Sequence, residues 1–482
     1  AMTVSNVTTA AAADSTNVVY GDANCDGKVD LSDAVLILQS ISKPSVYGLE
    51  GTDESRITAE GLDNADVYER GSGITAKDAL SIQRYIAGLC SLPESYQDGY
   101  VEPETDSVYI HLNNTSISVE GDSNGYAEVN GSTVTINHSG TYYVDGTLDD
   151  GQINVNIADE TADPDTVKIF LNGASITGKS DSPFVVTNAE KTSINLVDGT
   201  TNTISDGDTA YTSGNAVIEA KDDLTIKGGD NGTGKLIVTA NTQDGIVCNN
   251  DLKINNADVS VTTLNSTSGS KTNGINGKTS VDIKGTSVVT VDATSDGIKS
   301  TNGNVLIESS SVTVKAGADA VQSGTTIDIS GGSLVAGGDR GLTAASGVNI
   351  TGGTVIATAT DNQAEGVSSE NQATLLLNCI DSSESDACWK KANSISVGDV
   401  NASFTKKYKY VLISDASIKT GSSYSLTNAS TGAIVTHSND TATDFSVTDL
   451  VTTFETVNPA GKSGSSTTDP TTEGYTITLS GT

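Results

Sequence analysis

This chain of 482 residues has little of several residue types on which common protein functions depend. Lysine and arginine together number 26 against 61 aspartate and glutamate residues, a formal net charge of −35. This charge argues against nucleic acid as a partner, because phosphate binding requires basic surfaces. The three histidines, His111, His138 and His437, are far apart, so neither a histidine-based zinc site nor a serine–histidine–aspartate triad is expected. No run of 18 apolar residues occurs, so no membrane insertion is expected.

Aromatic residues are also scarce, at 4% of the chain with a single tryptophan. A flat, crystalline glycan surface usually requires a row of exposed aromatic rings, so such a partner is disfavoured. The abundant carboxylates suit calcium instead, a hard cation that prefers oxygen ligands. The acidic excess is also typical of a solvated, secreted surface.

Composition divides the chain into five segments. Residues 1–17 lack apolar periodicity and are predicted to be a disordered tail, whereas 18–92 contain two runs with apolar residues at helical spacing. Residues 93–106 are acidic, contain two prolines and are predicted to be a linker. Short strand-like runs separated by Gly, Asn, Asp and Ser fill 107–458. Residues 459–482 are predicted to be a second linker, and EGYTITLSGT, which is similar to SVYIHLNNT near the start of the strand-like region, is interpreted as the start of a second module; chance similarity of two strand-like runs after polar linkers is the alternative.

The strand-like region repeats. A small residue followed by an apolar one recurs every 21 to 29 residues, and each interval holds two further runs with alternating apolar residues. These pairs mark the coil starts: Ala216-Val217, Gly245-Ile246, Gly274-Ile275, Gly297-Ile298, Ala320-Val321, Gly341-Leu342 and Gly366-Val367. One triplet of strands cannot bury its apolar face alone, whereas stacked triplets form a continuous core. The repeat predicts a mainly β fold, a parallel β-helix, preceded by a small all-α module.

An acidic loop, DANCDGKVDLSD, precedes the first helical run, in which Leu31, Val35, Leu38 and Ile41 have helical spacing. Side-chain oxygens fall at loop positions 1, 3, 5, 9 and 12, a glycine falls at position 6, and position 7 offers its backbone carbonyl. This spacing is that of a calcium loop of the EF-hand type. The predicted ligands are Asp22, Asn24, Asp26, Lys28, Asp30 and Asp33.

A second loop, DVYERGSGITAKD, starts at Asp66 and has one extra residue, which places Asp78 one position late. Tyr68 and Arg70 stand where acid or amide ligands are usual, so backbone carbonyls are expected to supply part of the coordination. Asp66, Tyr68 and Asp78 are the predicted ligands. The expected cofactor is therefore Ca2+ in both loops.

The segments GDANCDGKVDLSDAVLILQSI and ADVYERGSGITAKDALSIQRYIAGL together resemble a dockerin, and the longer second loop resembles variants from rumen-type cellulosomes. The resemblance covers 18–92 and implies calcium-dependent docking to a cohesin of a scaffoldin, in a secreted, extracellular, cellulosome-associated protein. The family's recognition positions fall on two sets of residues: Leu31, Ser32, Leu38 and Gln39, and Ala76, Lys77, Gln83 and Arg84. Because the two sets differ chemically, one binding orientation is expected rather than two. For Leu38, a core position is the alternative.

The five cysteines are consistent with an extracellular compartment that permits disulfides. The ends of a dockerin come together, so a disulfide between Cys25 and Cys90 is one option. Cys379 and Cys388 are near enough in sequence to close a surface loop, and Cys248 is expected to be buried.

Polar residues flank the apolar residue that starts each coil. Stacked strands place equivalent residues about 4.8 Å apart, so these residues form ladders that are expected to face outward or to lie at a turn. The candidate carbohydrate-binding strip consists of Asp244, Asn273, Asn276, Asp296, Lys299, Asp319, Gln322 and Arg340. Stacked carboxylates repel unless a cation intervenes, which makes Asp296 and Asp319 candidate calcium ligands. Sugar hydroxyls suit the amides and acids, and uronates suit calcium, lysine and arginine. The alternative is that Asp and Asn before glycine simply form turns.

The coils resemble a carbohydrate-binding β-helix family that occurs linked to dockerins and is related in fold to pectate lyases. The resemblance rests on VKIFLNGASITG, DGIVCNN, DGIKSTNG, GVNITGG and YKYVLISDASI, and it covers about 106–458. It implies a right-handed helix, bound calcium and binding to plant cell-wall polysaccharide, acidic glycans included. No catalytic residue is predicted, and a monomer is expected. Two alternatives remain: a calcium-dependent polysaccharide lyase with Lys299 or Arg340 as base, and a spacer or adhesin without a sugar site.

Overall fold

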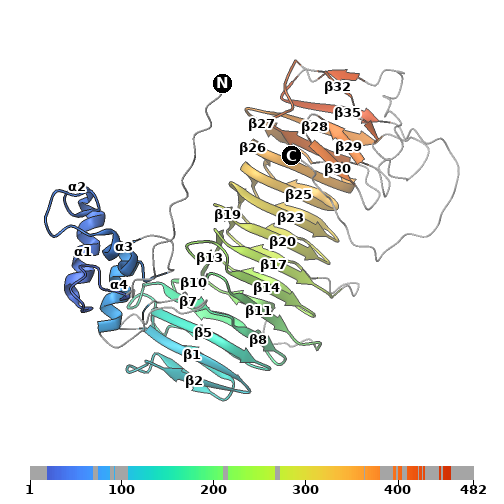
Figure 1. Ribbon diagram of the computed structural model, residues 1–482. Coiled ribbons are helices and arrows are strands. Elements are labelled where there is room, and N and C mark those ends of the chain that lie inside the picture. Colours follow the sequence, from blue (N-terminus) through green and yellow to red (C-terminus); the bar gives the residue numbers. More distant parts are fainter. Residues whose placement is uncertain are drawn as a thin grey trace, which may run out of the picture. The chain divides into compact units, whose positions relative to one another are not determined.

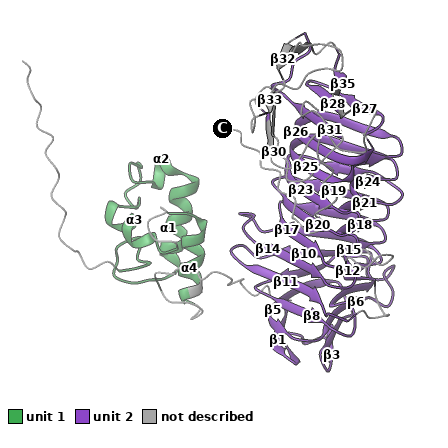
Figure 2. Cartoon of the chain, turned by 90° about the vertical axis from the view of Figure 1, so that its right-hand side faces the viewer, with its two compact units in different colours: residues 1–100 green, residues 101–482 purple. Residues whose placement is uncertain are grey.

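The chain consists of two compact units, Ala1–Tyr100 and Val101–Thr482 (Figure 2). The predicted tail at 1–17, the predicted linker at 93–106 and the segment 459–482 lie outside the described residues. No helix in the described part of the chain is long and apolar enough to cross a membrane. The computed structural model describes residues 19–68, 74–86, 92, 107–209, 215–265, 272–362, 364–379, 394–397, 400–403, 410–421, 423–425, 427–428, 444–446 and 449–456.

The described part of the N-terminal unit contains four short helices: α1 Leu31–Ser42, α2 Pro44–Tyr47, α3 Ala59–Ala65 and α4 Ala76–Ile86 (Figure 1). Asp30 caps α1: its side chain accepts the backbone N–H of Ser32, and Asp33 accepts the backbone N–H of Asp30 in return. Such a cap stabilises a helix by about 1 kcal/mol, because it satisfies N–H groups that have no partner within the helix. The unit buries a small apolar core: Ala23, Ala34, Leu36, Ile37, Ile57, Ala65, Val67, Ala79 and Ile82.

Helix α1 also has a second apolar face, which is exposed. Leu31, Val35, Leu38 and Ile41 have the spacing that predicted this helix, yet each side chain is between 41% and 60% exposed. The core side of the helix lies on the neighbouring positions around Ile37. The periodicity therefore predicted the helix correctly, but the core alternative for Leu38 is wrong.

The C-terminal unit is a stack of mostly parallel strands in three columns, which confirms the predicted parallel β-helix (Figure 1). Column A contains β4 Thr133–Ile136, β6 Gln152–Asn156, β9 Phe184–Asn188, β12 Ala216–Ala220, β15 Asp244–Cys248, β18 Ile275–Gly277, β21 Ile298–Ser300 and β24 Asp319–Ser323. Column B contains β1 Ser107–Asn114, β5 Gly140–Leu148, β7 Val167–Leu171, β10 Lys191–Leu196, β13 Asp223–Gly228, β16 Asp251–Asn255, β19 Ser280–Lys284 and β22 Val305–Ile307. Column C contains β8 Ser175–Gly178, β11 Thr201–Asp206, β14 Lys235–Ala240, β17 Asp258–Thr263, β20 Val288–Ala293 and β23 Ser310–Ala316.

Towards its C-terminal end the stack becomes irregular. The long strand β25 Thr326–Ala344 passes through all three columns, and β26 Gly347–Asn362 follows it. The predicted coil start Gly366-Val367 is wrong: it belongs to β27 Val367–Ser369, which pairs with the start of β26 in column B. β31 Tyr410–Asp415 inserts antiparallel between β26 and β28 Ala373–Cys379, an arrangement that the parallel repeat did not predict.

The remaining described strands do not belong to the three columns. They are β2 Ser116–Glu120, β3 Ala127–Asn130, β29 Ser394–Val397, β30 Val400–Ser403, β32 Ser423–Ser425, β33 Thr427–Asn428, β34 Asp444–Ser446 and β35 Val451–Thr456. β2 pairs antiparallel with β1, and β35 pairs parallel with β28.

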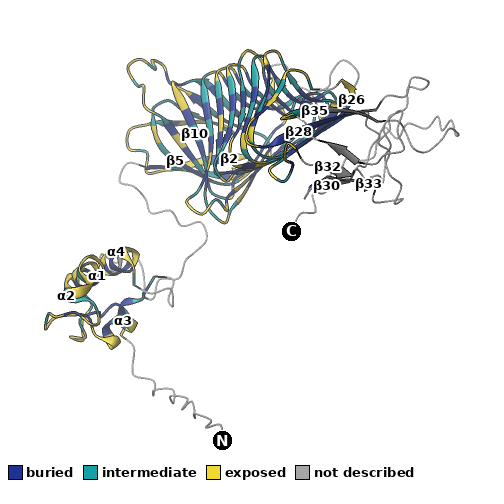
Figure 3. Ribbon diagram, turned by 90° about the horizontal axis from the view of Figure 1, so that it is seen from above, coloured by how far each residue is buried: buried dark blue, intermediate teal, exposed yellow. Residues whose placement is uncertain are grey.

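The core consists of single apolar residues that stack from coil to coil. Ile246, Ile275 and Ile298 occupy equivalent positions of column A and are fully buried. Figure 3 shows the resulting alternation of buried and more exposed residues along the strands. The preceding residue must be small, because a Cβ atom on Gly297 would lie 2.2 Å from Val314 Cγ1. The small-plus-apolar signature therefore reflects close packing between columns A and C.

Candidate functional site

The first acidic loop folds around its own side chains. Asp22 accepts the backbone N–H groups of Asp26 and Gly27 at 3.0 and 2.9 Å. Asn24 Oδ1 accepts the N–H of Asp26 at 2.9 Å, and Asp26 accepts that of Lys28 at 2.9 Å. Gly27 turns the chain with a φ of +83°, a conformation open to glycine.

Asp33 closes this loop. Its two carboxylate oxygens accept the backbone N–H groups of Asn24 at 3.0 Å and Asp30 at 2.8 Å, and its side chain is fully buried. Burial raises the pKa of Asp33 above its ordinary value; the two hydrogen bonds oppose this shift, and the charges of Asp22 and Asp30 add to it. A buried acid among other acids is stabilised in its charged form by a cation.

The donor set of the first loop is chemically suited to calcium, because it consists of oxygens supplied at loop spacing by acids and an amide. Within the described ranges, however, no group of three or more His, Cys, Asp or Glu side chains converges closely enough to hold a metal ion. Cys25 has a positive φ of 59° in this loop and a free thiol, so the disulfide with Cys90 that was one option above is wrong. Cys388 and the side chain of Cys379 fall outside the described residues, and so does their predicted disulfide.

The second loop repeats the closure of the first. Asp78 is fully buried and accepts the backbone N–H groups of Val67 and Tyr68 at 2.8 Å each, and that of Thr75 at 2.6 Å. Asp66 lies at the end of α3. The Nζ atom of Lys77 lies 4.9 Å from the centroid of the Tyr68 ring. Residues 69–73 are not described, so the structure places only the two ends of this loop.

The predicted cohesin contacts lie on the exposed sides of α1 and α4. Leu31, Ser32 and Leu38 are exposed and Gln39 is half-buried; Ala76, Lys77 and Gln83 are exposed on α4, while the side chain of Arg84 is not described. The prediction left out Val35 and Ile41, which continue the exposed apolar face of α1. Their spacing was visible in the sequence, but apolar spacing alone does not distinguish a docking face from a core face.

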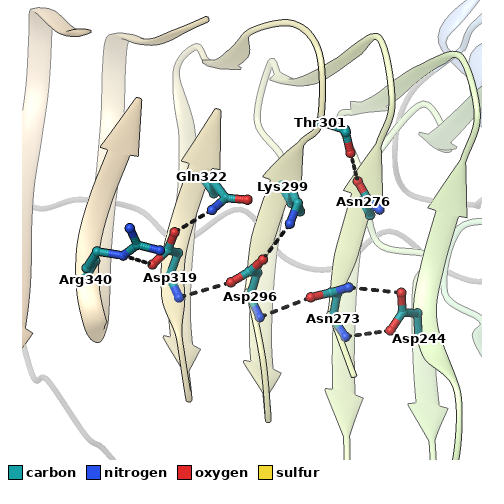
Figure 4. A network of polar contacts seen from close by, with 9 residues as sticks. All are labelled: Asp244, Asn273, Asn276, Asp296, Lys299, Thr301, Asp319, Gln322 and Arg340. Atoms are coloured by element: carbon teal, nitrogen blue, oxygen red, sulfur yellow. Dashed lines mark hydrogen bonds and ion pairs between the residues drawn. The ribbon is translucent and has the colours of Figure 1, made fainter. Parts of the chain in front are cut away.

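The predicted strip on the β-helix forms one hydrogen-bonded ladder (Figure 4). Asp244 Oδ1 accepts the backbone N–H of Asn273 at 2.7 Å. Asn273 Oδ1 accepts that of Asp296 at 3.2 Å, and Asp296 Oδ1 accepts that of Asp319 at 3.2 Å. Each side chain thus binds the backbone of the next coil at the turn into column A, which is the turn-forming role considered as an alternative above.

Basic and amide side chains donate hydrogen bonds to the carboxylates of this ladder. Lys299 Nζ donates to Asp296 at 2.9 Å, Gln322 Nε2 donates to Asp319 at 2.6 Å, and the Arg340 guanidinium also donates to Asp319 (Figure 4). The repulsion between stacked carboxylates is therefore relieved by side chains of the chain itself.

The acids of the ladder lie at the turn, which is the second of the two placements expected for this row. Asp319 is fully buried and Asp296 is 8% exposed. At this corner Asp244 and Asp296 each accept a backbone N–H in place of water. Burial raises the pKa of Asp244 and of Asp319; the hydrogen bonds from Asn273, and those of Arg340 and Gln322, act in the opposite direction.

A second row of polar side chains lies on the outer side of column A. Asn276 pairs in register with Lys299, and Lys299 pairs with Gln322. All three side chains are half-buried, and Asn276 accepts a hydrogen bond from Thr301 at 3.1 Å. This row is where a ligand would reach the predicted strip.

Comparison with known families identifies both units. A family model described as carbohydrate-binding domain-containing protein matches residues 130–430, more than half of the chain. The chain belongs to this carbohydrate-binding family. A model of the type I dockerin domain matches residues 20–87, so the N-terminal unit is a type I dockerin, as the sequence predicted.

Two related proteins match separate parts of the chain. A xylanase/β-glucanase of Ruminococcus flavefaciens is 52% identical over 87 residues, which are 18% of this chain and 11% of that protein. A carbohydrate-binding domain-containing protein of Acetivibrio thermocellus is 37% identical over 134 residues, which are 27% of this chain and 44% of that protein. The chain therefore spans less than half of the length of either relative.

Two solved structures are also similar in sequence. One is the third ScaB cohesin of R. flavefaciens in complex with a group 1 dockerin, with 57% identity over 15% of this chain and 95% of the matched chain, and a TM-score of 0.15. The other is a gadolinium derivative of the polysaccharide lyase-like protein from C. thermocellum, with 26% identity over 55% of this chain and 94% of that chain, and a TM-score of 0.37. The TM-scores are too low to compare the folds in detail.

Proposed function

We propose that the dockerin attaches this chain to a cohesin of a scaffoldin through the exposed apolar face of α1. The observation that carries the proposal is the row of Leu31, Val35 and Leu38, three large apolar side chains left exposed on one side of a small unit. A contiguous exposed apolar surface is typical of a protein–protein interface. The 57% identity to a dockerin that was solved with a cohesin supports the same partner.

A single binding orientation follows from the chemistry of the two helices. The α1 face offers Leu31, Ser32, Val35 and Leu38, whereas the equivalent positions of α4 hold Ala76, Lys77, Leu80 and Gln83, so only the apolar residue at Val35 and Leu80 is kept. A cohesin surface that accommodates the apolar row would meet a cation and an amide if the dockerin were rotated to exchange the helices. Burying those groups without partners disfavours the exchanged orientation.

Calcium is part of this proposal. Asp22, Asn24, Asp26, Asp30 and Asp33, with the carbonyl of Lys28, would hold one ion, and Asp66, Tyr68 and Asp78 would contribute to a second. The ion supplies positive charge that stabilises the clustered carboxylates. The raised pKa of Asp33 supports this assignment. Since Asp33 also caps α1, the ion would stabilise the helix that carries the docking face.

The β-helix is proposed to bind plant cell-wall polysaccharide, acidic glycans included, with Asn276, Lys299 and Gln322 on the outer side of column A as contacts. Family membership supports carbohydrate binding. Asp296 and Asp319 hold Lys299 and Gln322 of this row in place, and the remaining residues of the strip, Asp244, Asn273 and Arg340, support those two acids or continue their ladder. Lysine and arginine already neutralise Asp296 and Asp319, so calcium assistance at this site would act on the acidic glycan rather than on these carboxylates.

Lyase activity has less support than binding. The candidate bases, Lys299 and Arg340, are engaged in ion pairs with Asp296 and Asp319. A general base must instead be available to accept a proton. The whole protein is accordingly proposed to be a secreted, cellulosome-associated, monomeric binding component without catalytic residues in this part of the chain.

Affinity electrophoresis through gels that contain polygalacturonate, xylan or soluble cellulose derivatives tests the glycan half of the proposal. Retardation by at least one glycan supports it, and the same mobility in every gel contradicts it. Running each gel with calcium and with a chelator separates calcium-assisted binding from direct binding. Incubation of polygalacturonate with calcium, followed at 235 nm, tests for unsaturated product and hence for the lyase alternative.

A further inference from the structure

Lysines gather on the outer face of column B. Consecutive strands β7, β10, β13, β16 and β19 pair in register, and each contributes one outward-facing lysine. The five residues are Lys168, Lys191, Lys227, Lys253 and Lys284. The described strands contain eight lysines in all, so five on one face of an acidic molecule is a marked concentration. Strands β7, β10, β13 and β19 follow one another along the stack in Figure 1.

Most of these lysines have no acidic partner. In the described part of the chain, ion pairs are found for Lys235, Lys299 and Lys315 on the other two columns, and for Lys284 with Asp282. No ion pair is found there for Lys168, Lys191, Lys227 or Lys253, all of which are exposed. Three acidic residues share this face: Asp223 and Asp251 lie at its edge, where the strands begin, and Asp282 is in register with Lys253 and forms the ion pair with Lys284.

The spacing of these lysines suits an extended polymer. Neighbouring strands are about 4.8 Å apart, so one cation is presented at each step along the helix axis. That step is comparable to the length of one pyranose unit. Lys227, Asn255 and Lys284 occupy equivalent positions on the consecutive strands β13, β16 and β19. Lys253 of β16 lies two residues before Asn255, in the adjacent row of the same face.

Aromatic rings extend this face towards its N-terminal end. Tyr109, Tyr143 and Phe170 stack on successive strands, with ring centroids 5.2 and 4.8 Å apart. Phe170 lies in the row that continues through Asn195 to Lys227. Tyr143 is buried, so only the half-buried rings of Tyr109 and Phe170 are available for the apolar contact that a sugar ring also requires.

We infer that the outer face of column B is a second glycan-binding surface, which takes a carboxylated polysaccharide lying along the helix axis, without calcium. The inference rests on the proposed carbohydrate-binding function and adds a site distinct from the strip on column A. Charge complementarity carries it: each exposed, unpaired lysine attracts a carboxylate, whereas the rest of the chain, with its large negative net charge, repels a polyanion.

The test compares charge-matched variants of the whole chain. Lys227→Ala/Lys253→Ala removes two cations from column B, and Lys235→Ala/Lys315→Ala removes two from column C. Affinity for polygalacturonate is measured in the presence of a chelator at low and high salt, and circular dichroism confirms the fold of each variant. The column B variant is expected to bind about three- to thirtyfold more weakly, since each exposed pair contributes modestly. The column C variant is expected to bind like the wild type, and wild-type binding is expected to weaken with salt.

Three results would overturn the inference. Equal weakening in both variants would show a nonspecific effect of net charge, and no weakening in either would place the polyanion elsewhere. Binding of wild type to neutral glycans but not to polygalacturonate would also exclude it, while the proposed carbohydrate-binding function would stand. If the wild type binds no glycan at all, the proposed function itself fails, so the two failures are distinguishable.

Discussion

The Arg340 guanidinium donates to Asp319, a fully buried carboxylate one coil earlier in column A. Gln322 satisfies the other oxygen of the same carboxylate. Asp319 in turn donates its backbone N–H to Asp296, so this contact anchors one end of the polar ladder. A residue that was selected as a sugar contact therefore has a structural task in the helix.

Removal of Arg340 is expected to destabilise the β-helix. Arg340→Ala leaves Asp319 buried without its cation, and about 2 kcal/mol of unfolding free energy should be lost, less than for a fully buried pair because the arginine is partly exposed. Lys315→Ala, which breaks the more exposed pair with Asp292, should cost less than about 1 kcal/mol. Urea unfolding of both variants measures the difference, and equal costs would contradict a special role for Arg340.

Lowering the pH should raise the contribution of Asp244 to the unfolding free energy. Burial raises the pKa of Asp244, so the folded state holds a proton more tightly than the unfolded state. Stability from this group is therefore present below the ordinary carboxyl pKa and lost as the pH rises through the raised value. Relative to Asp244→Asn, the wild type should gain unfolding free energy as the pH falls from 7 towards 4. The burial argument would be contradicted if the unfolding free energy of the wild type, relative to that of Asp244→Asn, stayed constant or fell as the pH was lowered.

The small residue at the coil start should tolerate no larger side chain. A Cβ atom on Gly274 would lie 2.4 Å from Val291 Cγ1 and 2.7 Å from the carbonyl of Gly297. Gly274→Ala is expected to cost about 1–3 kcal/mol, as overpacking of a tight interior usually does. The double variant Gly274→Ala/Val291→Ala should recover less than the full loss, since the carbonyl contact remains. Thermal melts provide the comparison, and an unchanged Gly274→Ala melt would show that the corner is loosely packed.

The apolar face of α1 should dominate cohesin affinity. Val35→Asp or Leu38→Asp is expected to cost about 2 kcal/mol or more, because central apolar anchors contribute most of the binding energy of an interface. Leu49→Asp is the matched control: it introduces the same charge at a leucine with similar exposure outside α1. Calorimetry with the third ScaB cohesin of R. flavefaciens gives the affinities. Equal losses at Leu38 and Leu49 would contradict the assigned face.

Calcium removal should unfold the first loop before it affects the β-helix. A chelator is expected to lower the melting temperature of the dockerin, and Asp33→Asn should reproduce much of the effect, because Asp33 both closes the loop and caps α1. Asp163→Asn in the β-helix is the control, since this carboxylate accepts a hydrogen bond from Ser139 within the other compact unit. Calorimetry measures the melting temperature of the dockerin with calcium and with a chelator. The same melting temperature in both would contradict the calcium assignment.

The sequence predicted those features of the fold that repeat locally. Inward rows such as Ile246 and Ile275, each preceded by a small residue at the corner, allowed the coils from Gly245 to Gly341 to be aligned correctly. The predicted start Ala216-Val217 is one residue out of register, because Ile218 pairs with Ile246. The antiparallel insertion of β31 could not be predicted, because its pairing with β26 joins segments about 55 residues apart without any repeat. The coil start at Gly366-Val367 was misplaced because β26 ends the regular triplet spacing.

The candidate sites were predicted less completely than the fold. Loop spacing identified the acids that fold the first loop, since each position has a fixed geometric role. Ladder position identified Asp319 but not its burial, which depends on how tightly the corner packs. The lysines of column B were overlooked because Lys168, Lys227 and Lys253 are far apart in sequence and meet only through strand register.

The central claim is that one chain joins a scaffoldin to plant cell-wall glycan, and co-sedimentation tests it most directly. A purified cohesin is mixed with insoluble cell-wall polysaccharide, calcium and the full chain, and the pellet is assayed for cohesin. The account predicts cohesin in the pellet only when the chain is present, and its release into the supernatant by a chelator while the chain stays bound through column B. Cohesin that remains in the supernatant, with or without the chain in the pellet, would contradict the claim.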